Sequence, residues 1–140
     1  MRIIDCDVCI IGGGSAGVAA ALGASRVGSK VVLIERNACF GGQATNSQVS
    51  AFCGFYTRGS HPDQVVQGIG EEVLERLRGY GADTTPTISA STGNASIRFD
   101  PELMKFAFDD LMSESTVEYL LHASLVSVQG QDRKLSTVVG

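Results

Sequence analysis

The sequence predicts an α/β fold with a Rossmann-like parallel sheet, because two apolar runs flank a glycine-rich turn and a stretch of small residues. The first run, 8–11, leads directly into Gly-Gly-Gly-Ser-Ala-Gly at 12–17. The second run, 30–34, is continuous, as is typical of a buried parallel strand. Strand, turn, helix and strand follow one another within about 30 residues, as a βαβ unit of this kind requires.

The glycines of the turn have separate expected roles. Gly12 allows the tight turn between strand and helix, and Gly14 lets the backbone approach a pyrophosphate with no Cβ in the way. Gly17 lets the helix pack closely on the sheet. Free N–H groups and the positive dipole end at the helix start favour phosphate oxygens. The spacing therefore predicts a dinucleotide-binding turn, and the alternative is a buried helix with incidental glycines.

An acidic residue follows the second strand at the position that this unit requires. Glu35 comes directly after the apolar run 30–34. A carboxylate at this strand end can accept hydrogen bonds from the hydroxyls of an adenosine ribose. Glu35 is therefore the predicted ribose-binding residue.

The rest of the chain predicts further elements in order. Segment 36–59 is expected to be an irregular, glycine-rich loop with aromatic anchors, and 64–78 a helix with an apolar stripe that Gly79 closes. The polar segment 84–96 is expected to be either a surface connection or a weak edge hairpin. The apolar stripe of the helix consists of Val65, Ile69, Val73 and Leu77.

A third helix and three more strands complete the prediction. Asp100 and Pro101 provide an N-cap and a first-position proline for a helix. A strand over 117–121 follows, and the short strands 125–128 and 135–139 form the beginning of an antiparallel meander. The buried side of the helix is expected to consist of Leu103, Phe106, Ala107, Leu111 and Met112.

Composition limits the function classes. The chain has 140 residues, enough for one domain, and 44% of them are hydrophobic. A net charge of −4 gives no electrostatic reason to expect nucleic acid. The apolar stretches are too short to span a bilayer, and the first strand begins too soon after Met1 to leave room for a signal peptide. We therefore expect a cytoplasmic protein with neither a nucleic-acid nor a membrane partner.

Three blocks of the sequence resemble the amino-terminal part of FAD-dependent oxidoreductases with a glutathione-reductase-type fold. The dinucleotide turn at 7–17 and the strand at 32–36 are shared with many flavoproteins. Gly-Gly-Gln-Ala-Thr at 41–45 resembles the second glycine loop of the family, and 99–104 resembles its helix opening. The resemblance covers essentially the whole chain and implies FAD as the cofactor.

The resemblance also implies a set of cofactor-binding residues. Glu35 binds the ribose with Arg36 nearby, and backbone groups near Leu125 and Val126 approach adenine. Arg36 is alternatively an exposed charge at a strand end, and Gln43 and Thr45 are alternatively loop residues that bond their own backbone. The expected pyrophosphate residues are Gly12, Gly14, Ser15, Ala16 and Gly17, and those along the diphosphate and ribityl chain are Gly42, Gln43, Ala44 and Thr45.

The chain departs from the family in its length. Family members run to several hundred residues and carry a later ribityl-binding block and a substrate domain. Residues 1–140 are therefore expected to be the amino-terminal part of an FAD-binding domain, with the substrate domain absent. The first strand would then lack its usual outer neighbour, and this exposed edge predicts self-association.

The four cysteines and two histidines give weak signals. Cys6 and Cys9 form a C-x-x-C, but residues three apart on one strand point to opposite faces, which disfavours a disulfide or a shared metal. Cys39 is either a redox-active thiol near the flavin or a small buried cysteine. His61 and His122 are expected to be a turn residue and a strand-end residue. No catalytic residue and no metal site is predicted.

Two function classes follow from these observations. The first is the FAD-binding part of an oxidoreductase that transfers hydride or electrons to or from an organic substrate. The second is a non-catalytic or degenerate module that binds an ADP moiety or nothing. A dehydrogenase that uses NAD alone is disfavoured, because the glycine block at 41–45 has no function in it.

Overall fold

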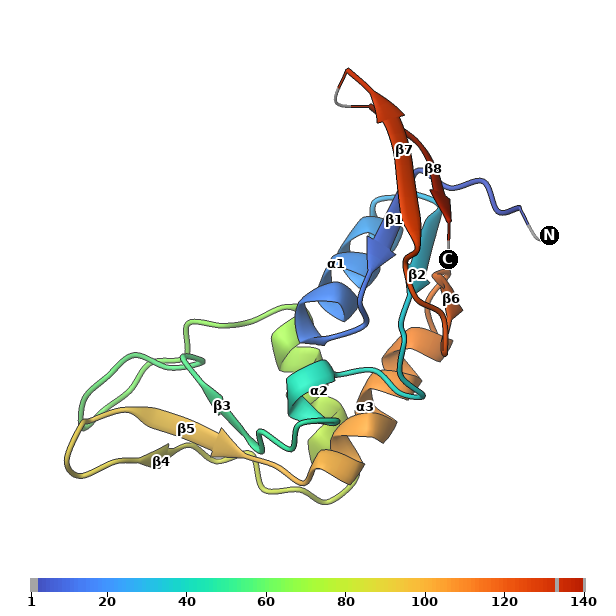
Figure 1. The fold of residues 1–140 in the computed structure, drawn as a ribbon. Helices are drawn as coiled ribbons and strands as arrows, with labels where there is room; N and C mark the ends of the chain where they lie inside the picture. The colour runs from blue at the N-terminus through green and yellow to red at the C-terminus, as the bar shows by residue number, and fades with distance from the viewer. Residues whose placement is uncertain (1–2, 133, 140) are drawn as a thin grey trace.

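A parallel sheet forms the centre of the protein, as the sequence predicts. The computed structural model describes residues 3–132 and 134–139 (Figure 1). Strands β1 (Val8–Ile11), β2 (Val31–Ile34) and β6 (Glu118–Leu120) pair in the order β1-β2-β6, and both pairings are parallel. The helix α1 (Ser15–Arg26) connects β1 to β2. The predicted βαβ unit is therefore confirmed.

The core lies between this sheet and three helices. Helices α1, α2 (Ile69–Gly79) and α3 (Pro101–Ser113) contact one another, and α1 also contacts β1 and β2. Leu33 of β2 belongs to the core, whereas its neighbours along the strand lie on the other face of the sheet. The fully buried side chains include Val18, Leu22, Leu33, Leu74, Leu77, Met104 and Met112.

The start of α3 confirms its predicted cap. The Asp100 carboxylate accepts a hydrogen bond from the backbone N–H of Glu102 at 2.8 Å, and Pro101 occupies the first turn. The prediction that Phe106 is buried is wrong, because its side chain is 56% exposed and its ring lies against Tyr80. Met104 and Phe108 are the buried residues that the prediction missed.

The predicted helix over 64–78 is wrong at its beginning. The helix begins at Ile69, and the preceding Gly68 has a φ of 63°, in the left-handed region that favours glycine. Segment 64–66 instead runs beside an earlier loop, where the N–H of Val65 donates to the carbonyl of Phe55 at 2.7 Å. The apolar spacing alone predicts a longer helix, because it does not show that segment 64–66 hydrogen bonds to an earlier loop.

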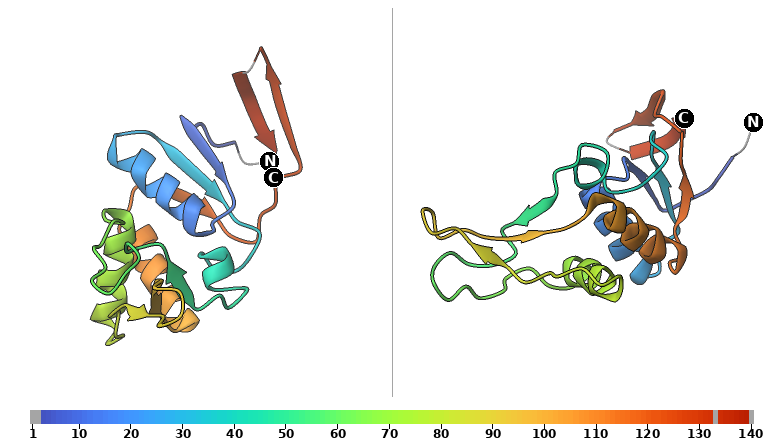
Figure 2. Two further views of the ribbon diagram at one scale, coloured as in Figure 1. Left: turned by 90° about the vertical axis from the view of Figure 1, so that its left-hand side faces the viewer. Right: turned by 90° about the horizontal axis from the view of Figure 1, so that it is seen from below.

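A second, antiparallel sheet forms an arm that extends away from the helices (Figures 1 and 2). Its strands β3 (Ala51–Cys53), β5 (Ala95–Arg98) and β4 (Thr87–Ile88) pair in the order β3-β5-β4. The hairpin alternative for 84–96 is confirmed. The expectation that 36–59 is irregular throughout is wrong, because β3 finds its partner more than 40 residues later.

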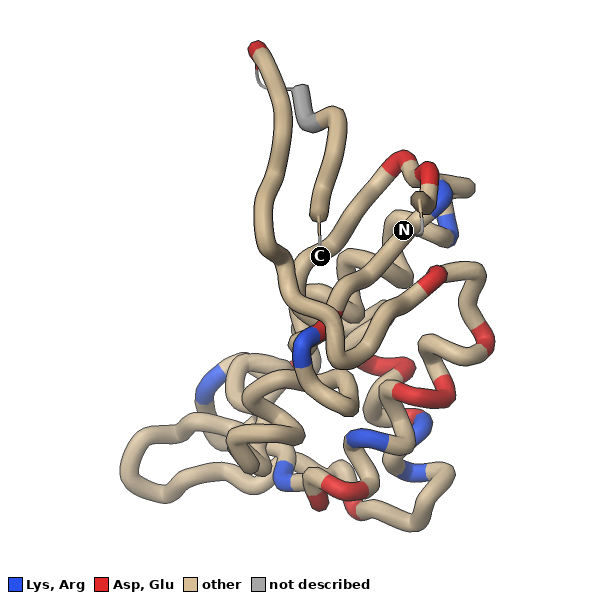
Figure 3. The backbone as a smooth tube through the Cα atoms, turned by 45° about the vertical axis from the view of Figure 1, so that its right-hand side comes forward, with Lys and Arg blue, Asp and Glu red and all other residues tan. Residues whose placement is uncertain are grey.

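The end of the described chain is a hairpin of β7 (Ser127–Gln131) and β8 (Lys134–Val139). This antiparallel pairing confirms the predicted start of a meander. Within the described residues, β1 pairs with β2 alone, so that β1 is an edge strand. In Figure 3, basic residues lie among acidic ones rather than in one group.

Candidate functional site

The glycine turn after β1 has the geometry that its spacing predicts. Gly12 has a φ of 98°, and its N–H donates to the carbonyl of Ile34 at 2.8 Å. A Cβ on Gly17 would lie 1.8 Å from the carbonyl oxygen of Gly12, so that only glycine fits there. The turn and the helix therefore pack without space for a side chain at this contact.

Neither the backbone conformation of Gly14 nor its neighbours require glycine there. Its φ is −66°, which any residue adopts, and a Cβ there would meet only the Gly42 Cα at 3.9 Å. The protein itself therefore does not demand glycine at this position. A side chain at Gly14 would project toward the second glycine loop, so its absence leaves space in front of the helix.

The first turn of α1 leaves two of its donors free. Within the described residues, no hydrogen bond engages the N–H groups of Ala16 and Gly17, and no acidic residue lies in that turn. Ser15, in contrast, lies beside Gly41 in a bridge between the two glycine loops. Ser15 and Ala16 are exposed. Free N–H groups at the positive end of a helix dipole form a favourable place for an anion.

A second glycine loop lies against the first. It contains the short 3₁₀ helix η1 (Gly42–Ala44) and is docked by the N–H of Gly41, which donates to the carbonyl of Gly13 at 2.8 Å. The Ser15 hydroxyl donates to the carbonyl of Gly41 at 3.4 Å. A Cβ on Gly42 would lie 3.0 Å from the Cα of Gly14, so the approach of the two backbones leaves little room for a side chain at Gly42.

Some side chains of the second loop are buried and others are exposed. Thr45 is 2% exposed, and its hydroxyl donates to the carbonyl of Phe40 at 2.6 Å. Thr45 therefore bonds its own loop, which is the alternative that the sequence left open. Ala44 is also buried, whereas Gln43 is exposed and its backbone carbonyl accepts from the N–H of Val49. Of this block, Gly42 and Gln43 are the residues with accessible surface.

Glu35 is a buried carboxylate, 5% exposed, beside the first glycine turn. Its Oε2 accepts from the N–H of Gly13 at 2.6 Å. Its Oε1 accepts from the N–H and from the side-chain Nδ2 of Asn37, each at 2.7 Å. The carboxylate is thus fixed to the turn that would hold the pyrophosphate.

Gly13 is a site residue that the sequence analysis missed. A Cβ there would lie 2.9 Å from the Phe40 ring and 3.1 Å from the Glu35 Cβ. Glycine at this position therefore lets Glu35 approach the turn. The signal in the sequence was the middle glycine of an unbroken triplet, which the standard spacing treats as variable.

Two other predicted residues lie apart from this cluster. Arg36 is exposed. Val126 is 75% exposed, and its N–H donates to the carbonyl of Val139 at 2.8 Å. The part of the β6 exit that contacts the Glu35 region is 122–123, because the N–H of Ala123 donates to the carbonyl of Glu35 at 3.0 Å.

The expected geometry of Cys6 and Cys9 is wrong. Cys6 precedes β1, so strand alternation does not separate the two side chains. Burial raises the pKa of the Cys9 thiol, and the nearby Cys6 thiol raises it further. All four cysteines are free, and Cys39 donates to the Asn46 side-chain oxygen at 3.4 Å. Among the described residues, no group of three or more side chains could hold a metal ion.

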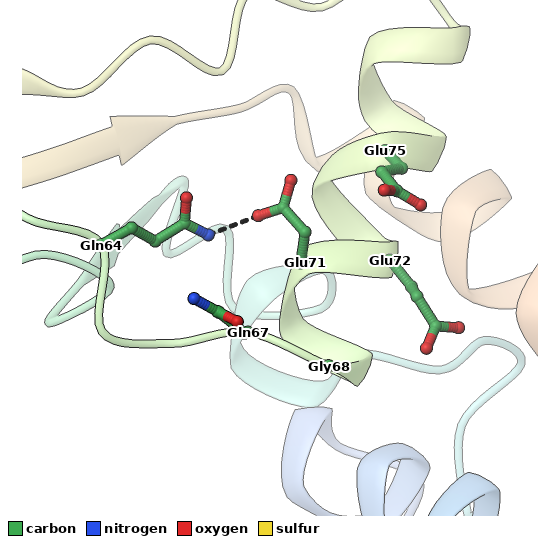
Figure 4. A pocket seen from close by; sticks show the side chains of 6 residues that line it. All are labelled: Gln64, Gln67, Gly68, Glu71, Glu72 and Glu75. Carbon is green, nitrogen blue, oxygen red and sulfur yellow. Dashed lines mark hydrogen bonds between the residues drawn. The ribbon is translucent and has the colours of Figure 1, made fainter.

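A shallow hollow at the start of α2 is acidic, but its carboxylates are largely engaged (Figure 4). Glu71 pairs with Arg78 and accepts from Gln64, and Glu72 pairs with Arg26 at 2.6 Å. These partners lower the pKa of both carboxyl groups. Surface ion pairs therefore account for the acidic side chains Glu71 and Glu72 of this hollow.

Comparison with known proteins shows the family to which the chain belongs. The family model described as FAD dependent oxidoreductase matches residues 7–140, which is nearly the whole chain. None of the helices in the described part of the chain is long and apolar enough to cross a membrane.

Solved structures show the same fold at low sequence identity. THI4 of Thermovibrio ammonificans is 18% identical with a TM-score of 0.54, and the match covers 95% of this chain and 45% of that protein. GidA of Aquifex aeolicus is 18% identical with a TM-score of 0.59, over 96% of this chain and 22% of that one. A geranylgeranyl bacteriochlorophyll reductase-like protein of Thermoplasma acidophilum is 16% identical with a TM-score of 0.53, over 95% and 34%. The chain thus spans less than half the length of each of these proteins.

Proposed function

The chain belongs to the family of FAD-dependent oxidoreductases, whose cofactor is FAD, and on this premise we propose that its two glycine loops and Glu35 hold the adenosine diphosphate part of FAD. The observation that carries the proposal is the close approach of the loops: a Cβ on Gly42 would lie 3.0 Å from the Gly14 Cα. A ligand phosphate needs such a place, where backbone N–H groups are free and no side chain intervenes.

Each part of the site has a proposed binding partner. The helix start, with its free N–H groups, holds the pyrophosphate, and Glu35 accepts hydrogen bonds from the ribose. Gly42 and Gln43 lie along the diphosphate and ribityl chain, while the buried Ala44 and Thr45 support that loop from within. The proposed pyrophosphate residues are Gly12, Gly14, Ser15, Ala16 and Gly17. We propose that Arg36 and Val126 lie at the outer edge of the adenosine side, where the Arg36 side chain is exposed and backbone groups near Val126 approach adenine.

The proposed reaction is that of the longer protein to which this part belongs. FAD supplies hydride or electron transfer when bound, and a protein of this family uses it on an organic substrate. The described residues bind and orient the adenosine end of the cofactor, and we assign them no catalytic group. We propose that residues 1–140 are the amino-terminal part of an FAD-binding domain, which the 22–45% coverage of the similar proteins supports. The cytoplasmic location is likewise proposed, and cell fractionation tests it.

Substitution of Gly14 tests the proposal directly. Gly14→Val places a branched side chain in the space before the helix, and we expect it to abolish ADP binding while the thermal unfolding curve changes little. The control is Gly79→Val, at an exposed helix end where a Cβ meets nothing within 4 Å. ADP binding is measured by ligand-observed NMR titration, which detects weak binding.

Two results would contradict the proposal. If Gly14→Val binds ADP as the wild type does, the pyrophosphate does not lie at this turn. If the wild type binds neither ADP nor FAD, the alternative of a degenerate module holds. A visible flavin spectrum in the purified protein would instead favour a complete flavin site over a module for the ADP moiety alone.

A further inference from the structure

Asn37 belongs to no sequence motif, but it makes two hydrogen bonds to the Glu35 carboxylate. Both its backbone N–H and its side-chain Nδ2 donate to Oε1 of Glu35, each at 2.7 Å. Its carbonyl accepts from the N–H of His122 at 3.2 Å. Asn37 therefore joins the Glu35 carboxylate to the turn that follows β6.

Glu35 needs such a partner because it is a buried acid without a cation. Among the described residues, it is the only carboxylate that is buried. Arg36, the next residue, is exposed, and no described ion pair includes Glu35. A buried charge is stable only when hydrogen bonds replace its hydration. Asn37 supplies two of the three donors, and Gly13 supplies the third.

The same bonds limit how Glu35 can meet a ligand. An ionised carboxylate offers about four acceptor positions, two on each oxygen. Asn37 takes two at Oε1, and Gly13 takes one at Oε2. The position left for a ligand hydroxyl is therefore on Oε2, the oxygen that Asn37 does not contact.

We propose that Asn37 is a positioning residue for ribose recognition, because its side chain fixes Oε1 of Glu35 and so leaves Oε2 to accept from a ribose hydroxyl. This inference rests on the proposed function. It assigns Asn37 no contact with the ligand. The two backbone hydrogen bonds of Asn37 remain when its side chain is shortened, so Asn37→Ala removes only the Nδ2 donor.

The test compares ADP with 2′,3′-dideoxy-ADP, which lacks both ribose hydroxyls, by NMR titration of the full chain. In the wild type, we expect ADP to bind about tenfold more tightly than the dideoxy compound. In Asn37→Ala, we expect this preference to fall to about twofold while the affinity for the dideoxy compound stays unchanged. Asn37→Leu, which fills the same space without a donor, is a second variant. Asn94→Ala, in an exposed turn of the arm, is the matched control and should keep the preference.

A double-mutant cycle separates positioning from a structural effect. If Asn37 acts through Glu35, Asn37→Ala should have no further effect on ADP affinity in a Glu35→Ala background. The inference is wrong if the Asn37 variants lower the affinity for both ligands equally, or leave the preference unchanged. A wild type that binds ADP with no preference over the dideoxy compound would overturn the ribose assignment of Glu35, and the inference with it. Absence of any ADP binding would instead overturn the proposed function.

Discussion

The carbonyl oxygen of Gly12 lies where a Cβ on Gly17 would be, at a distance of 1.8 Å from that ideal Cβ position. This contact joins the end of β1 to the first turn of α1. Gly14 differs from Gly17, because a Cβ on Gly14 would make only an ordinary contact with the Gly42 Cα, at 3.9 Å. Two glycines of one motif therefore differ: the fold requires Gly17, whereas it does not require Gly14, which we propose leaves room for a ligand.

The first prediction concerns Gly17. Gly17→Val should lower stability strongly, because the Gly12 carbonyl oxygen lies 1.8 Å from the position that the Cβ would take. The loss should exceed about 3 kcal/mol, at the upper end of the effects of overpacking. Urea denaturation followed by circular dichroism measures it, with Gly79→Val as the control. A Gly17→Val protein with wild-type stability would show that the two segments do not pack as described.

The second prediction concerns Glu35. Glu35→Ala should weaken ADP binding by roughly 1.5–3 kcal/mol, the range for hydrogen bonds to a charged group. Because Glu35 also accepts from Gly13 and Asn37, thermal unfolding of the variant must be measured alongside ADP affinity. Glu75→Ala, at an exposed position of α2, provides the comparison. Equal ADP affinity in the wild type and the Glu35 variant would remove this residue from the site.

The third prediction concerns the cap of α3. Asp100→Ala should destabilise the protein by about 1 kcal/mol, because the N–H of Glu102 loses its acceptor at the helix start. The effect is read from the midpoint of a urea titration. Asp5→Ala, at an exposed position before β1, should leave that midpoint unchanged. Identical midpoints for both variants would mean that the cap contributes no stability.

The fourth prediction concerns flavin binding by residues 1–140 on their own. We expect this chain to bind FAD poorly or not at all, because the proposed site lies mainly at the adenosine diphosphate end of FAD and the chain spans only 22–45% of the similar proteins. Gel filtration followed by a visible spectrum of the protein peak measures bound flavin. A yellow product with stoichiometric FAD would contradict the prediction and would indicate a complete minimal flavin domain.

The fifth prediction concerns the edge strand β1. An unpaired strand edge recruits other strands, so the chain should self-associate. Ile11, at the end of β1, is 45% exposed, and Ile11→Lys should shift the gel-filtration peak toward the monomer because a charge on an edge opposes pairing. Val27→Lys, outside the sheet at an 82% exposed position, should not shift it. A wild-type chain that is already monomeric would show that β1 does not recruit a partner.

Predictions that failed concern segments whose partners are distant in the chain. Phe52 of β3 lies beside Ile97 of β5, a pairing that no local pattern at 51–53 announces. The spacing of segment 64–66 is helical, but its backbone N–H groups donate to the carbonyl of Phe55. The helix therefore begins only at Ile69, after Gly68. The helical spacing places Phe106 on the buried side of α3, yet its ring is exposed and lies against Tyr80.

The sequence by itself determined the βαβ unit, the places of Gly12 and Gly17, the cap at Asp100 and the family. These depend on backbone conformation, strand alternation and short-range hydrogen bonds, which residues close together in the chain specify. Only the tertiary structure decided that the loop at 41–45 rests on Gly13, and that Asn37 and Gly13 together hold the Glu35 carboxylate. Gly13 reaches Gly41 and Glu35 because β1 and β2 lie side by side. The path of the loop after β2 places Asn37 beside Glu35, so no spacing in the sequence specifies these contacts.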